Sequence, residues 1–131
     1  MRELKFRAWY TPEKEYIYNV QDTYDNACEG SGSLYHENFR EVLEDEDCAV
    51  EQYTGLKDKN GKKIYEGDIV QQVAISGGRF AVVKWIDANA KFIAMNIRNH
   101  RQMPFDSWTA RAELMVVGNI HENPELLEGD E

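Results

Sequence analysis

The stretch from residue 53 to residue 70, YTGLKDKNGKKIYEGDIV, places the tightest constraint on what this chain can fold into. Two runs of β-favouring residues, at 50–56 and 64–65, flank a polar loop that ends in Asn60-Gly61. Asn-Gly tolerates the positive φ angles of a tight turn, so we expect a β-hairpin here. Glu66-Gly67-Asp68 then predicts a second sharp turn, whose aspartate can bond its own backbone before the next strand begins.

Short strand patterns recur through the rest of the chain. Leu4, Phe6 and Ala8 alternate with Lys5, Arg7 and Trp9, which is the period-two pattern of a strand with one buried face. A second predicted strand at 16–20 completes an amino-terminal hairpin. Strands at 69–75, 80–86 and 91–97 are predicted to form a three-stranded meander. A last strand at 113–120 can close the sheet, with a bulge or close backbone approach at Gly118-Asn119.

Less regular segments lie between these strands. Residues 21–33 are rich in Asp, Asn, Gly and Ser and predict a surface loop. Ser33 can cap a short helix that runs through Asp47, with a partial apolar face from Leu34, Phe39, Val42 and Leu43. The acids at 44–47 oppose the helix dipole and should end that helix early. Residues 98–107 predict a loop or irregular edge, and residues 125–127 predict one helical turn.

These patterns together predict a mainly β fold with one short helix. Strands at spacings of about 8 to 12 residues with tight turns indicate an antiparallel barrel or sandwich rather than a parallel sheet. We expect two parts: an amino-terminal arm of β-hairpin, flexible loop and short helix over residues 1–49, and an SH3-like antiparallel barrel with an acidic tail over residues 50–131.

The overall charge limits the classes of partner. A net charge of -9 with a pI near 4.8 repels nucleic acid phosphates and suits a protein partner with a basic surface. The start of the chain, MRELKFRAW, lacks the apolar core of a signal peptide, and no apolar run reaches the length of a membrane span. We therefore expect a cytoplasmic protein with no membrane partner, and the sequence leaves homo-oligomer formation open.

No motif predicts an active site, a cofactor or a metal centre. Cys28, His36 and Cys48 are widely separated and match no ligand spacing, so we interpret them as structural residues. His100 and His121 lack a motif partner, and the glycine-rich segments lack the GK[ST] ending of a phosphate-binding loop. The acidic run at 44–47 is interpreted as a solvated face, with an interaction patch as the alternative.

Two basic islands are the candidate binding residues. The first gathers on the central hairpin and comprises Lys57, Lys59, Lys62 and Lys63. These lysines can meet an acidic or phosphate-bearing partner, or can simply keep the hairpin tip soluble and deter edge pairing.

The second island places Arg98, His100 and Arg101 near Phe105 and Trp108. Basic groups mixed with aromatic rings are what single-stranded nucleic acid binding uses. The competing interpretation is that the aromatic residues of this region, Trp85, Phe105 and Trp108, belong to the core of a small β domain. The candidate partner-binding residues are Lys57, Lys59, Lys62, Lys63, Arg98, Arg101 and Trp108.

Three blocks occur in a familiar order: MRELKFRAW at the start, YTGLKDKNGKKIYEGDIV in the middle and VVGNIHENPELL near the end. With these blocks the chain resembles the YopX family, a group of mostly uncharacterised phage and prophage proteins. The resemblance spans the whole chain and implies a β-rich protein of the bacterial cytoplasm, with no catalytic residues to carry over. Tyr10 stands where an Asp is common in the family, and His121 where a Tyr is common.

Three functional hypotheses follow. The first is a non-enzymatic phage accessory module that binds a macromolecular partner, most readily a host or phage protein, through barrel loops and the arm. The second is local nucleic acid binding through the basic islands, against the net charge. The third is an uncharacterised enzyme. Binding through several lysines and arginines weakens steeply with salt, and this separates the second hypothesis from the first.

Overall fold

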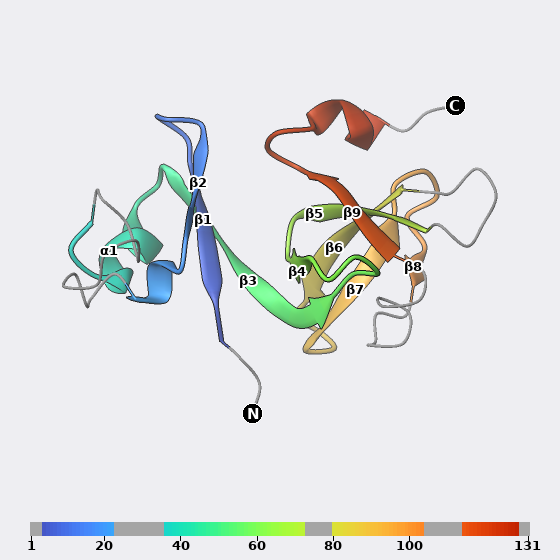
Figure 1. Ribbon diagram of the computed structural model, residues 1–131, viewed down its shortest axis with the longest axis horizontal. Helices are drawn as coiled ribbons and strands as arrows, with labels where there is room; N and C mark the ends of the chain where they lie inside the picture. Colours follow the sequence, from blue (N-terminus) through green and yellow to red (C-terminus); the bar gives the residue numbers. More distant parts are fainter. Residues whose placement is uncertain (1–3, 23–35, 73–79, 104–113, 129–131) are drawn as a thin grey trace. The chain divides into compact units, whose positions relative to one another are not determined.

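The computed structural model describes residues 4–22, 36–72, 80–103 and 114–128 (Figure 1). The described residues form two antiparallel sheets and one short α-helix, which confirms the predicted mainly β fold. The chain divides into two compact units, residues 1–53 and 54–131, and the division falls inside strand β3 (Cys48–Lys57). Among the described residues, no helix is long and apolar enough to cross a membrane.

The first sheet has the strand order β2-β1-β3-β4. Strands β1 (Phe6–Tyr10) and β2 (Glu15–Tyr18) pair in antiparallel fashion and confirm the amino-terminal hairpin. Val20, predicted as the end of the second strand, instead begins the 3-10 helix η1 (Val20–Asp22). Ala8, Val20 and Val42 are fully buried together, so β1, η1 and the α-helix share one small core.

Both faces of β1 are covered, which corrects the predicted one-sided pattern. Arg7, expected on the solvent face, is 4% exposed, whereas Leu4 is 57% exposed. The Nε of Arg7 donates to Oε1 of Glu51 on β3 at 2.9 Å, and Arg7 lies opposite Glu51 in the strand pairing. The guanidinium also stacks 4.1 Å from the ring centroid of Tyr16. The Arg7–Glu51 ion pair is therefore buried, although the period-two pattern predicts that Arg7 faces solvent.

The helix α1 (Phe39–Glu44) is shorter than predicted. Asn38 is its N-cap and accepts a hydrogen bond from the Glu41 N–H at 3.0 Å, while the Glu41 carboxylate accepts from the Glu37 N–H at 2.8 Å. The prediction that the helix starts at Ser33 is wrong, because residues 36–38 are not helical; Ser33 itself lies outside the described residues. The helix ends at Glu44, early in the acidic run, as its charge pattern predicts.

The central hairpin and the turn after it are confirmed. Strand β3 is followed by β4 (Lys63–Tyr65), and Gly61 in the intervening turn has a φ of +84°. Gly67 in the second turn has a φ of 87°, and Oδ2 of Asp68 accepts from the Tyr65 N–H at 2.8 Å. Asp68 thus bonds its own turn, as its position in the sequence predicts.

The second sheet has the order β8-β7-β6-β5-β9 and curls into a half-barrel (Figure 1). Its strands are β5 (Asp68–Gln72), β6 (Phe80–Ile86), β7 (Lys91–Asn96), β8 (Gln102–Met103) and β9 (Leu114–Asn119). The predicted meander is β5-β6-β7, and β9 closes the sheet by pairing with β5. The predicted turn at 76–79 lies outside the described residues.

The core of the second unit, residues 54–131, is aliphatic, and strands β4, β5, β6, β7 and β9 each contribute to it. Its buried members are Ile64, Val70, Ala81, Val83, Ala94 and Leu114. Trp85, for which a core position was the competing interpretation, is instead 42% exposed; it packs edge-on to Phe92 and donates its Nε1–H to Asp87. The chain continues from β9 into the 3-10 helix η2 (Pro124–Glu128), where a helical turn was expected.

Candidate functional site

The first candidate surface is the β3–β4 tip, defined here as residues 57–63. It contains four lysines and one aspartate, so its formal charge is +3 on a chain whose net charge is -9. Lys57, Lys59 and Lys62 are exposed, and Lys63 is half-buried. The structure therefore brings all four predicted lysines to one turn.

A buried carboxylate organises this tip from inside. Asp58 is 3% exposed, and its Oδ1 accepts from the N–H groups of Asn60 at 2.8 Å and Lys62 at 2.9 Å. The Asp58 backbone N–H also donates to the Lys62 carbonyl at 2.8 Å. Because three bonds converge on one residue, the turn has little freedom to change its shape.

The tip is also attached to the closing strand β9. The second carboxylate oxygen of Asp58, Oδ2, accepts from the Val116 N–H at 2.9 Å, and the Lys59 N–H donates to the Leu114 carbonyl at 3.0 Å. Through these bonds, the backbone of the β3–β4 tip is attached to the half-barrel. The backbone of the exposed lysines is thus fixed, while their long side chains extend into solvent.

The second basic island lies in the turn between β7 and β8. Arg98, His100 and Arg101 are all exposed, and the backbone is fixed by asparagines: Oδ1 of Asn96 accepts from the Arg98 N–H at 2.8 Å, and Oδ1 of Asn99 accepts from the Arg101 N–H at 2.9 Å. Phe105 and Trp108, the aromatic members predicted for this island, lie outside the described residues. The described part of the island is a second rigid basic turn.

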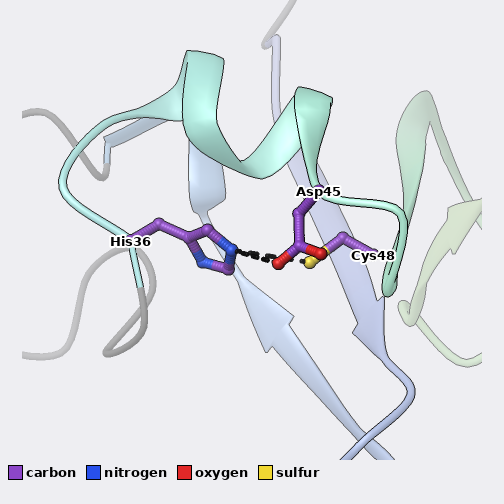
Figure 2. Close-up of side chains that lie close together, drawn as sticks. All are labelled: His36, Asp45 and Cys48. Atoms are coloured by element: carbon purple, nitrogen blue, oxygen red, sulfur yellow. Dashed lines mark hydrogen bonds and ion pairs between the residues drawn. The ribbon is translucent and has the colours of Figure 1, made fainter.

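The structure also brings together His36, Asp45 and Cys48, a set that no sequence motif predicts. His36 precedes α1, Asp45 is its C-cap and Cys48 begins β3, and Figure 2 shows the three side chains pointing toward one another. Nε2 of His36 lies 2.7 Å from Oδ2 of Asp45 and 3.9 Å from Sγ of Cys48. His36 and Cys48, which are widely separated in the sequence and were interpreted as structural residues, are therefore neighbours, whereas Cys28 lies outside the described residues.

The electrostatics of this cluster favour a charged carboxylate and a neutral thiol. The hydrogen bond from the Asp47 N–H and the bond to His36 hold the pKa of Asp45 below its usual value of 3.8. Burial, together with the charge of Asp45, raises the pKa of Cys48 to about 11. The pKa of Tyr10, whose ring meets His36 edge-on, is also raised, by desolvation and by nearby acids that include Asp45 and Asp47.

This geometry is unlike that of an activated thiol nucleophile. In a Cys-His-Asp relay, one ring nitrogen of the histidine takes the thiol proton while the other is held by the acid. Here the same nitrogen, Nε2, faces both Asp45 and Cys48. The three side chains instead bring one nitrogen, one oxygen and one sulfur atom within 4.8 Å of one another.

Comparison with known proteins places residues 5–128 of the chain in one family. The family model described as YopX protein matches residues 5–128. The crystal structure of protein EF1440 from Enterococcus faecalis is similar in fold, with a TM-score of 0.69 and 29% sequence identity over 97% of this chain and 99% of that one. No curated protein matches the chain.

Proposed function

The chain belongs to the YopX protein family, and from that premise we propose that it is a non-enzymatic binding module of phage or prophage origin. It acts in the bacterial cytoplasm by docking onto a macromolecule, and that macromolecule is a protein. The docking surface is the β3–β4 tip, and the docking site on the partner is acidic.

The observation that supports this proposal is the way Asp58 holds the tip. The carboxylate accepts hydrogen bonds from Asn60, Lys62 and Val116, so the backbone under Lys57, Lys59 and Lys62 is ordered before any partner arrives. Binding is weakened by the entropy lost when flexible groups are ordered, and a turn that is already fixed avoids most of that loss.

The distribution of charge favours a protein partner over nucleic acid. A tip of charge +3 on a chain of net charge -9 attracts an acidic patch that faces it and repels a long polyanion that extends past it. A protein can present a compact acidic patch, whereas a nucleic acid carries phosphates along its whole length.

Capture from the lysate of phage-carrying bacteria tests this function. The immobilised chain is incubated with lysate that has been treated with nuclease, and retained proteins are identified by mass spectrometry. We expect specific proteins to be retained after nuclease treatment, and no shift of labelled oligonucleotides at low salt. Retention that disappears with nuclease, or an oligonucleotide shift that weakens steeply as salt rises, would replace the protein partner with nucleic acid.

A further inference from the structure

We propose that His36, Asp45 and Cys48 form a binding site for one zinc ion. The candidate ligand atoms, Nε2 of His36, a carboxylate oxygen of Asp45 and Sγ of Cys48, all lie within 4.8 Å of one another (Figure 2). This site is independent of the β3–β4 tip and of the proposed partner.

The distances are close to those that zinc requires. Zinc binds nitrogen and oxygen at about 2.0 to 2.1 Å and sulfur at about 2.3 Å, so its tetrahedral ligands lie roughly 3.2 to 3.8 Å apart. The Sγ to Nε2 distance of 3.9 Å between Cys48 and His36 is about 0.1 Å beyond the upper end of this range, so only a small shift is needed. The Nε2 to Oδ2 distance of 2.7 Å must lengthen by about half an ångström or more. The Asp45 side chain is 27% exposed and can make that adjustment by rotating toward solvent.

The local fold holds two of the ligands at a spacing that suits a metal. Asp45 and Cys48 are three residues apart across a turn in which the Cys48 N–H donates to the Asp45 carbonyl at 3.0 Å. The Asp47 N–H binds Oδ1 of Asp45 at 2.8 Å and so leaves Oδ2 directed at His36. Zinc ligands commonly come in pairs separated by two residues, because such a turn brings both side chains to the same side.

The donor set and its charge select zinc over harder cations. Sulfur and imidazole nitrogen are poor ligands for Mg²⁺ and Ca²⁺ but are the preferred ligands of zinc. One thiolate and one carboxylate balance the charge of the ion. The His36 side chain is only 6% exposed, so its ring is already positioned, and water can occupy the fourth coordination position on the exposed side of Asp45.

Proton balance accompanies the binding step. Nε2 of His36 lies 2.7 Å from Oδ2 of Asp45, and burial raises the pKa of Cys48, which favours its thiol form. Zinc binds the neutral imidazole of His36 through Nε2, with the ring proton on Nδ1, and binds Cys48 as the thiolate. The thiol proton therefore passes to solvent, and the electron pairs on sulfur and on Nε2 form the bonds to the ion.

Metal titration of the untagged full chain tests the site. We expect one equivalent of Zn²⁺ by calorimetry, and with Co²⁺ as a spectroscopic substitute we expect the near-ultraviolet charge-transfer band of a cobalt-thiolate bond. Cys48→Ser should abolish that band, and His36→Ala should weaken Zn²⁺ binding on the order of 100-fold or more. The matched controls, Cys28→Ser and His100→Ala, should behave as the wild type. A wild type that binds no Zn²⁺, or a band that persists in Cys48→Ser, would overturn the proposal.

A second measurement needs no variant and so is unaffected by misfolding. The chain has three histidines, at 36, 100 and 121, whose imidazole signals can be followed individually by NMR. One equivalent of Zn²⁺ should shift the signals of His36 and leave those of His100 and His121 in place. Equal shifts at all three histidines, or shifts at His100 or His121 alone, would show that Zn²⁺ binds elsewhere.

Discussion

The carboxylate of Asp58 accepts a hydrogen bond at 2.9 Å from the backbone N–H of Val116, a residue 58 positions further along the chain. The two carboxylate oxygens of Asp58 therefore stabilise the β3–β4 tip and attach it to β9, the strand that closes the half-barrel. Stability and the presentation of the lysines depend on the same side chain.

Replacement of Asp58 should weaken the fold. Asp58→Ala leaves the N–H groups of Asn60, Lys62 and Val116 without their acceptor, and we expect it to lower the free energy of unfolding by about 3 kcal/mol. Asp58→Asn keeps one carbonyl oxygen and should cost roughly 1 kcal/mol. Urea unfolding followed by circular dichroism measures both changes. Equal losses for the two variants would contradict the acceptor role.

The buried ion pair between Arg7 and Glu51 gives a second prediction. Arg7→Leu leaves the Glu51 carboxylate, 6% exposed, without its cation, and should lower the free energy of unfolding by about 3 kcal/mol. The double variant Arg7→Leu/Glu51→Leu removes both charges and should be more stable than Arg7→Leu alone. Chemical denaturation of the two variants checks this order, and a double variant that is less stable would show that the pair is not the source of the loss.

Gly118 tests a close approach in β9. A Cβ at this position would lie 2.5 Å from Oδ1 of Asn123, so we expect Gly118→Ala to lower the free energy of unfolding by about 2 kcal/mol. In an Asn123→Ala background the same change should cost less. Gly61→Ala is the matched control: its φ is +84° but its surroundings are open, so its loss should not depend on residue 123. A Gly118→Ala loss that is unaffected by Asn123→Ala would exclude the steric cause.

The raised pKa of Cys48 predicts its reactivity. In a Cys28→Ser chain without metal, a pKa of about 11 in place of 9.0 should make alkylation at pH 8 roughly 100-fold slower than in denaturing urea. The rate should keep rising above pH 9, and a plateau there would contradict the shift. Because folding raises this pKa, the stability that comes from the neutral thiol is full below pH 9 and is lost as the pH rises toward 11.

Local turn chemistry is the part of the fold that the sequence predicts best. Asn60-Gly61 and Asp68 each shape a turn through their own backbone or side chain, so their roles are visible from a few neighbouring residues. The helix start is different. Ser33 and Asn38 are both suitable caps, and only Glu41, three residues after Asn38, marks the true start as a capping box does.

Partners that are distant along the chain explain what could not be predicted. Arg7 is buried because Glu51, 44 residues away, lies opposite it, and strand alternation contains no information about that partner. His36 meets Cys48 because α1 turns the chain back between them. Asp45, their third neighbour, was part of an acidic run that resembles any solvated face.

The measurement that tests the account most directly is capture by charge-reversed variants of equal net charge. Lys59→Glu/Lys62→Glu alters the β3–β4 tip, and Lys84→Glu/Lys91→Glu makes the same change at exposed lysines of β6 and β7. We predict that the tip variant, folded by circular dichroism, loses the proteins retained by the wild type at least about tenfold, while the β6–β7 variant keeps them. Retention of the same proteins by both variants would contradict a docking role for the tip.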